Sequence, residues 1–129
     1  MWEDNMRNMT AWMASATAAF LALAGSAIAG ECGYAQCWGA VGIGPGGAWG
    51  YSYGMYSETD AVNALQNECE WDCDNVHTFY NTCGAIAEGN SGNWGFGWAG
   101  TRSQAENNAM SYCYQNGGGC SVRVWACSP

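Results

Sequence analysis

The chain has 129 residues with 11 acidic and 3 basic side chains, no lysine, and a formal net charge of −8. Binding to nucleic acid or to an anionic membrane surface needs a cluster of cations, which so few arginines do not supply. The length predicts one small domain, and the charge favours partners that are neutral or cationic.

Residues 1–29 have the features of a secretory signal peptide. An apolar, alanine-rich run is followed by Ala27 and Ala29, whose small side chains are typical of a cleavage site. Two acidic residues near the start are unusual in such a segment, and translation from Met6 or Met9 would remove them. A retained N-terminal anchor is the alternative interpretation.

Cleavage would leave residues 30–129, which keep 9 acidic and 2 basic side chains after the loss of two acids and one arginine, a net charge of −7. All eight cysteines lie in this part. An even number of cysteines in a short secreted chain is typical of disulfides rather than metal ligands. We expect a periplasmic or extracellular bacterial domain that does not insert into a membrane after signal cleavage.

The first half of the domain follows a short arm at residues 30–37. A strand over 38–43, a Gly/Pro turn and a second strand over 48–55 predict a hairpin. The second strand alternates strictly, so that its aromatic side chains share one face and its small residues share the other. These aromatic residues are Trp49, Tyr51 and Tyr53.

A helix and a third strand complete this half. Ser57 is the predicted N-cap, and Ala61, Leu65 and Cys69 form a buried stripe at four-residue spacing. The segment 73–80 contains β-branched and aromatic residues and predicts a strand.

The second half repeats this order. The strand that begins at Cys83 is followed by a second aromatic-glycine strand, a helix capped by Thr101 and a last strand that begins at Cys120. The aromatic residues of the repeated strand are Trp94, Phe96 and Trp98, and the helix repeats the buried stripe as Ala105, Ala109 and Cys113.

This repetition predicts an α+β fold of two tandem β-β-α-β repeats, residues 38–82 and 83–129, in one pseudo-twofold antiparallel-sheet domain with two helices. Neither repeat is large enough to bury a core alone, so the two either share one sheet or pack as a pseudo-dimer.

The order of these elements resembles domain of unknown function 4189, a family of small secreted bacterial domains. The resemblance rests on the paired Trp-Gly-aromatic strands, the capped alanine-rich helices, and the final Trp-Ala-Cys-Ser, and it covers roughly residues 38–128. The family implies no activity, cofactor or catalytic residue. The cysteine pair at the start, Cys32 and Cys37, departs from the family's usual pattern.

The repeat also suggests how the cysteines pair. Equivalent positions after each helix predict Cys69–Cys73 and Cys113–Cys120, and the arm predicts Cys32–Cys37. Cys83–Cys127 then remains and would tie the copies together. Cys37–Cys127 is the competing pair for this last bridge.

The six aromatic residues Trp49, Tyr51, Tyr53, Trp94, Phe96 and Trp98 are the candidate binding surface. Tryptophan and tyrosine combine a large apolar area with a polar edge, which suits sugars, peptides and protein partners. If the two aromatic strands are neighbours, the rings would form one platform. The alternative is that the rings fill the core between the copies, and the small size of the domain favours it.

No catalytic, cofactor-binding or metal-binding residues are predicted. The acidic run 68–74 lacks the spacing of a calcium loop, and the glycine segments lack the lysine of a phosphate loop. His77 is the only histidine, and Glu58 with Glu88 shows no spacing that singles it out as a glycosidase pair.

The sequence therefore predicts a non-catalytic binding or inhibitor module of unknown ligand, with a cationic protein as the favoured partner because the chain is acidic. The alternative is a carbohydrate- or peptidoglycan-binding module that uses the aromatic strands. A small hydrolase is the third hypothesis.

Overall fold

The computed structural model describes residues 30–129, so the predicted signal peptide lies outside the described part. The first repeat consists of β1 (Trp38–Ile43), a short 3-10 turn η1 (Pro45–Gly47), β2 (Trp49–Met55), α2 (Glu58–Glu68) and β3 (Asn75–Tyr80). The second consists of β4 (Cys83–Glu88), β5 (Trp94–Ala99), α3 (Arg102–Gln115) and β6 (Ser121–Cys127). The α+β class and the two β-β-α-β repeats are confirmed.

Each repeat forms its own three-stranded antiparallel sheet, with strand orders β2-β1-β3 and β5-β4-β6. The register repeats as well, because Val41 pairs with Tyr51 in the first sheet and Ile86 pairs with Phe96 in the second. The copies therefore do not share one sheet. They pack as a pseudo-dimer, the other arrangement expected from the sequence.

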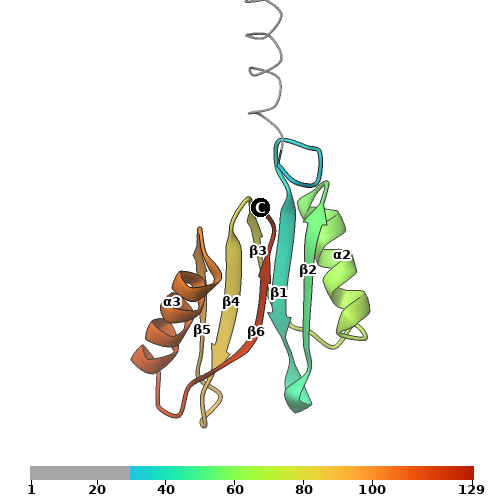
Figure 1. The fold of residues 1–129 in the computed structure, drawn as a ribbon. Helices are drawn as coiled ribbons and strands as arrows, with labels where there is room; N and C mark the ends of the chain where they lie inside the picture. Colours follow the sequence, from blue (N-terminus) through green and yellow to red (C-terminus); the bar gives the residue numbers. More distant parts are fainter. Residues whose placement is uncertain (1–29) are drawn as a thin grey trace, which may run out of the picture.

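The two sheets lie face to face between the two helices, which gives four layers (Figure 1). The core between the sheets is built from Val41 and Ile43 of β1, Phe79 of β3, Ile86 of β4, and Val124 and Ala126 of β6. Because this core takes side chains from both copies, neither copy buries its inner sheet face without the other.

Each helix covers the outer face of its sheet and lies against the small side chains of the aromatic-glycine strand. Ser52 of β2 donates a hydrogen bond from its hydroxyl to the carbonyl of Ala61, at 2.7 Å. A Cβ atom at Gly97 of β5 would overlap the backbone of Ala105 and Ala109 in α3. Glycine at this position allows the close approach of helix and strand, and the aromatic side chains point away from the helix.

Both helices begin at the N-cap residues that the sequence predicts. The hydroxyl oxygens of Ser57 and Thr101 accept hydrogen bonds from the backbone N–H of Asp60 and Gln104, at 3.1 and 3.3 Å. Such caps satisfy backbone donors that the first helical turn leaves unpaired.

The structure contains the disulfides Cys32–Cys37, Cys69–Cys73, Cys83–Cys127 and Cys113–Cys120. These are the four pairs expected from the sequence, and Cys37–Cys127 is not formed, but the expected role of Cys83–Cys127 is wrong. The two residues pair across β4 and β6 of one sheet, so the bridge closes the second copy instead of tying the copies together.

Polar contacts join the copies in addition to the shared core. The backbone N–H of Gly54 donates to the Ser128 hydroxyl at 2.9 Å, and Arg123 donates from Nη2 to the Gly47 carbonyl at 2.6 Å. Both contacts connect the hairpin of the first copy with the C-terminal segment of the second.

The N-terminal arm is held at the turn between β3 and β4. Asn81 accepts from the Cys37 N–H at 2.9 Å and donates to the Ala35 carbonyl at 2.8 Å. Within residues 30–129, no helix is long and apolar enough to cross a membrane.

Candidate functional site

The two aromatic strands β2 and β5 are edge strands of different sheets. They are therefore not neighbours, and their rings do not form one platform. Each faces the third strand of the other copy across the gap between the sheets. The result is two separate aromatic grooves, which we name after the third strand that borders each one.

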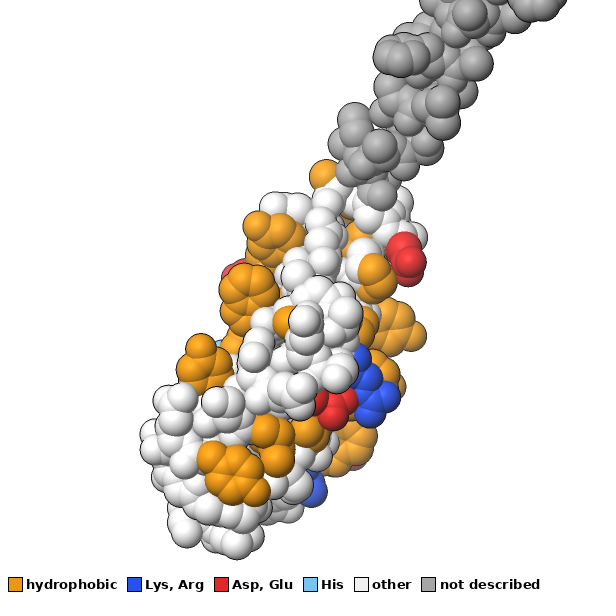
Figure 2. All heavy atoms as spheres, turned by 60° about the vertical axis from the view of Figure 1, so that its left-hand side comes forward, with side chains coloured by type: hydrophobic (Ala, Val, Ile, Leu, Met, Phe, Trp, Pro, Cys, Tyr) orange, Lys and Arg blue, Asp and Glu red, His pale blue; other side chains and the backbone are white. Residues whose placement is uncertain are grey.

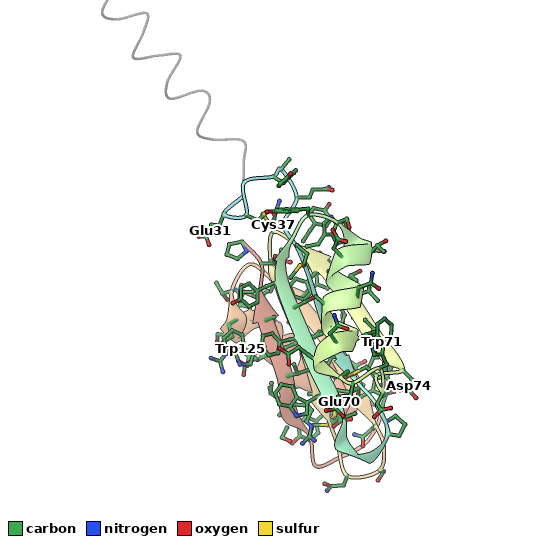
Figure 3. The ribbon with its side chains drawn as sticks, turned by 90° about the vertical axis from the view of Figure 1, so that its right-hand side faces the viewer. Glu31, Cys37, Glu70, Trp71, Asp74 and Trp125 are labelled. Atoms are coloured by element: carbon green, nitrogen blue, oxygen red, sulfur yellow. A yellow bond between two sulfur atoms is a disulfide. The ribbon has the colours of Figure 1, made fainter. Side chains whose placement is uncertain are left out.

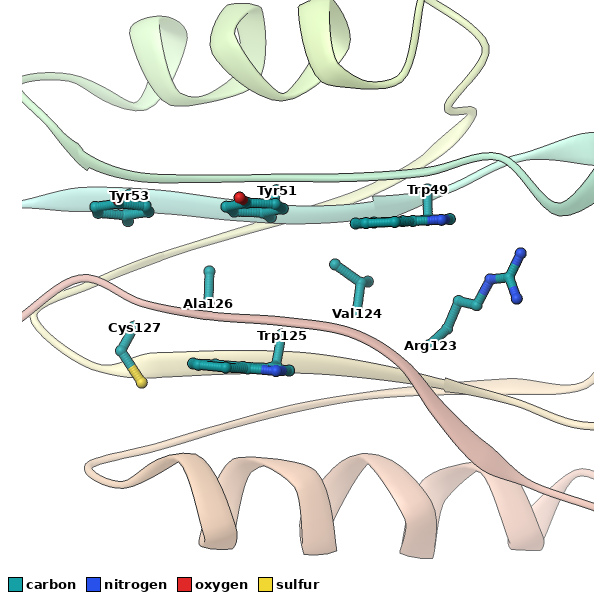
Figure 4. Close-up of a pocket in the computed structure, with 8 residues that line it drawn as sticks. All are labelled: Trp49, Tyr51, Tyr53, Arg123, Val124, Trp125, Ala126 and Cys127. Carbon is teal, nitrogen blue, oxygen red and sulfur yellow. The ribbon is translucent and has the colours of Figure 1, made fainter.

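The β6 groove lies between β2 and β6 and has a volume of about 580 Å³. It is lined by Trp49, Tyr51, Tyr53, Arg123, Val124, Trp125, Ala126 and Cys127, as Figure 4 shows. The aromatic side chains of β2 form one wall, and the backbone and small side chains of β6 form the other.

The rings of β2 form a flat row along the strand (Figure 4). The Trp49 and Tyr51 ring centroids are 6.3 Å apart with an interplanar angle of 11°, and those of Tyr51 and Tyr53 are 6.4 Å apart with an angle of 2°. Tyr51 packs on the core between the sheets, whereas Trp49 and Tyr53 are 47% and 59% exposed. The row is therefore core at its centre and open surface at its two ends.

Both arginines of the described chain lie beside the β6 groove. Arg123 lies at one end, with its Nε 3.7 Å from a carboxylate oxygen of Glu88. Arg102 places its guanidinium 3.7 Å from the centre of the Trp125 ring and pairs with Glu106. Trp125 points away from the row of rings (Figure 4), so this cation–π contact forms on the outer side of β6.

The β3 groove lies between β3 and β5 and has a volume of about 570 Å³. It is lined by Trp38, Glu58, Thr78, Phe79, Tyr80, Asn81, Thr82, Phe96 and Trp98. Five consecutive residues from Thr78 to Thr82 run along it, so the end of β3 and the turn that follows form its floor.

The walls of the β3 groove combine aromatic rings with one carboxylate. The Trp38 and Tyr80 rings lie 4.9 Å apart on one side, and Trp98, which is 62% exposed, lies on the other. The Thr78 hydroxyl donates a hydrogen bond to Oε2 of Glu58 at 3.2 Å. Among the described residues, no basic side chain lines this groove.

Trp94 lines neither groove, although the sequence groups it with the candidate binding residues. Its ring centroid lies 5.2 Å from that of His77, which stacks on Phe96 at 4.6 Å. Partial burial among these rings lowers the pKa of His77 below its usual value. The His77 Nε2 lies 2.8 Å from Oδ1 of Asn75, a contact that holds the ring in place.

The acidic run 68–74 forms an exposed turn closed by the Cys69–Cys73 bridge. Figure 3 shows Glu70, Trp71 and Asp74 together at the end of α2. Across residues 30–129, no group of three or more histidine, cysteine or carboxylate side chains is arranged to hold a metal ion. The Glu58 carboxylate accepts a hydrogen bond from Thr78, whereas the Glu88 carboxylate forms an ion pair with Arg123.

Several groove residues carry no signal in the sequence. Trp38, Tyr80 and the segment 123–127 become candidate site residues only because the sheets pack face to face and bring the third strand of one copy against the aromatic strand of the other. Figure 2 shows large hydrophobic side chains on the surface beside the few charged ones.

Comparison with known proteins gives one family and one similar structure. A family described as "Domain of unknown function (DUF4189)" matches residues 38–127. The NMR structure of Rv1813c from Mycobacterium tuberculosis is similar with a TM-score of 0.56 and 24% identity, over 80% of this chain and 89% of that chain. At this identity the likeness shows the fold alone. No curated protein matches the chain significantly.

Proposed function

Because this chain belongs to the DUF4189 family, whose description assigns no activity, we propose its function from the geometry: a secreted binding domain without catalysis that engages an extended segment of a cationic protein in its aromatic grooves. The single observation that carries the proposal is that three rings of the repeated strands, Trp49, Tyr53 and Trp98, are exposed along two open grooves.

Exposed aromatic side chains support a binding surface. A small domain that needs every large ring for its core does not leave Trp49, Tyr53 and Trp98 about half exposed. Contiguous apolar surface bordered by polar groups is typical of interaction sites, and aromatic residues are enriched there.

The distribution of charge supports a cationic partner. The first copy, residues 38–82, has six carboxylates and no basic residue, whereas the second, residues 83–129, has two carboxylates and two arginines. The acidic half would attract a cationic partner at long range and raise its association rate. The four disulfides support a secreted domain, because such bonds persist in oxidising compartments.

The test is an NMR titration of residues 30–129 with a lysine octamer, followed through the backbone amides and the tryptophan indoles. We expect shifts at Trp49, Trp98 and the neighbouring strand residues. Trp49→Ala and Trp98→Ala should each weaken binding about fivefold or more, because each removes a groove wall.

Trp71→Ala is the matched control, since Trp71 is an exposed tryptophan outside both grooves. It should leave the affinity for the octamer within about twofold of the original. Shifts confined to residues 68–74 would contradict the proposal, because they would mean that the octamer is attracted only by the acidic turn.

A glycan is the second candidate ligand, favoured by one observation. The three parallel rings of the β6 groove form a flat row, and the apolar face of a sugar ring packs well on such a surface. A titration with an N-acetylglucosamine hexamer tests this: shifts along β2 that disappear in Trp49→Ala would support it. No shift along β2 at millimolar hexamer would end it.

A further inference from the structure

We infer that the β3 groove binds a basic side chain of the partner, an arginine or a lysine, carried on an extended segment that lies along the free edge of β3. This inference rests on the proposed function and assigns a place and a chemistry to its cationic ligand. It follows from the backbone edge, the aromatic walls and the carboxylate of the groove.

The floor of the groove includes a strand edge that is open to pairing. Among the described strands, β3 is hydrogen-bonded to β1 alone, and its other edge faces the groove. An extended peptide can add to such an edge through main-chain hydrogen bonds, with alternate side chains entering the pockets beside it. Within the floor, Thr78, Phe79 and Tyr80 belong to this edge, and Asn81 and Thr82 belong to the turn between β3 and β4.

The aromatic walls suit a cation. Trp38 and Tyr80 form a tilted pair on one side of the floor, and the exposed Trp98 lies on the other. The face of an aromatic ring attracts an ammonium or guanidinium group within about 6 Å of its centre, most strongly for tryptophan. Rings on both sides would hold the stem of a long basic side chain and its charged end.

Glu58 supplies the counter-charge. Its Oε2 accepts the hydrogen bond from Thr78, which holds the carboxylate beside the edge of β3. Both arginines of residues 30–129 are already paired, Arg102 with Glu106 and Arg123 with Glu88. Within the described chain, the Glu58 carboxylate therefore remains available to a cation from outside.

The β6 groove is the counterpart of the β3 groove in the repeat, but the charge of its lining is different. It has a similar volume and an aromatic wall, but its lining, taken over the described residues, includes Arg123 and no carboxylate. A basic side chain is therefore favoured more strongly in the β3 groove, where a carboxylate lines the site, than in the β6 groove, where Arg123 lies beside Glu88. The duplication has thus produced two grooves of similar shape and different charge preference.

The test uses a peptide of about seven residues that alternates threonine and valine around one central arginine, with citrulline replacing arginine in the comparison peptide. Citrulline keeps the shape of arginine without its charge. For residues 30–129, we expect the arginine peptide to bind about tenfold more tightly and to shift the amides of Thr78 to Thr82. Glu58→Gln should reduce this preference to about twofold or less.

Asp60→Asn is the matched control, because it removes one carboxylate from the same first turn of α2 but does not line the groove. It should retain the tenfold preference. Trp98→Ala, at an exposed position, should weaken the arginine peptide more than the citrulline peptide, because the ring attracts the charged group.

Three results would overturn the inference. If the two peptides bind the β3 groove equally, the groove does not select charge, and the proposed function survives. If shifts appear in the β6 groove alone, the assignment to β3 is wrong, and the proposed function again survives. If neither peptide shifts either groove at millimolar concentration, both the inference and the proposed function fail.

Discussion

His77 and Val124 occupy equivalent positions in the two copies. His77 pairs with Val41 across β3 and β1, and Val124 pairs with Ile86 across β6 and β4. Val124 is buried in the core between the sheets, while His77 is partly buried against Phe96. The first copy therefore has a titratable ring where the second has an aliphatic side chain.

This difference predicts a pH dependence of stability. Because burial lowers the pKa of His77 in the folded state, the unfolded chain takes up its proton first as the pH falls below about 6.5. The folded state then loses stability relative to the unfolded state, and the loss stops below the folded-state pKa. Above about pH 7 both states are neutral at this residue, and the effect is absent.

The variant His77→Val copies the second repeat and removes this contribution. Urea unfolding at about pH 7.5 and about pH 5 should show that the original protein loses more unfolding free energy than the variant. All other side chains are the same in the two proteins, so the comparison isolates the contribution of His77. Equal losses would show that His77 has the same proton affinity in the folded and unfolded states.

At the scale of the element, the helix and the aromatic-glycine strand approach each other closely in each copy. Gly50 lies under Leu65 and Cys69 of α2, and Gly97 lies under α3. A side chain at either position would push the helix off its sheet. The glycines are therefore required by the approach of the two backbones and not by an unusual backbone angle.

Gly97→Ala should lower the unfolding free energy by about 2 kcal/mol or more, because the added methyl group has no space against the backbone of Ala105 and Ala109. Gly100→Ala, just after the same strand, is the control, since no atom lies within 4 Å of the place that its methyl group would occupy. Chemical denaturation of the two variants measures the difference. Similar stability of both would mean that α3 does not lie this close to β5.

At the scale of the whole molecule, the shared core makes the two copies one folding unit. Ile86 lies in this core with no exposed surface, next to side chains from both sheets. Ile86→Ala should cost about 2–5 kcal/mol and should leave a single unfolding transition. Near-UV and far-UV circular dichroism should give the same midpoint, and two separate transitions would show that each copy folds independently.

The same packing decides where ligands are expected to bind. Each groove combines the aromatic strand of one copy with the third strand of the other, so an isolated copy would contain neither groove. The two copies also differ in charge, because most of the carboxylates lie in the first copy. Glu58 in the β3 groove and Arg123 in the β6 groove are enough to give the two duplicated grooves different charges.

The sequence by itself determined the local features, because each depends on neighbours along the chain. The alternation in β2 separates ring and glycine faces, Ser57 and Thr101 cap the helices, and the stripe of Ala105, Ala109 and Cys113 is buried as expected. Because these features occur twice in the same order, the sequence also predicted the α+β fold class. The predicted signal peptide is a separate matter and stays a prediction.

Tertiary structure alone decided which strands face each other. Local patterns do not distinguish a shared sheet from two packed sheets, since both bury the same faces of each repeat. Face-to-face packing separates the rings of Trp49 and Trp98 into two grooves and places Tyr51 and Phe96 at the border of the core. The question of core or binding surface therefore has a different answer for neighbouring rings of one strand: Tyr51 packs against the core, whereas Trp49 and Tyr53 on either side of it are exposed.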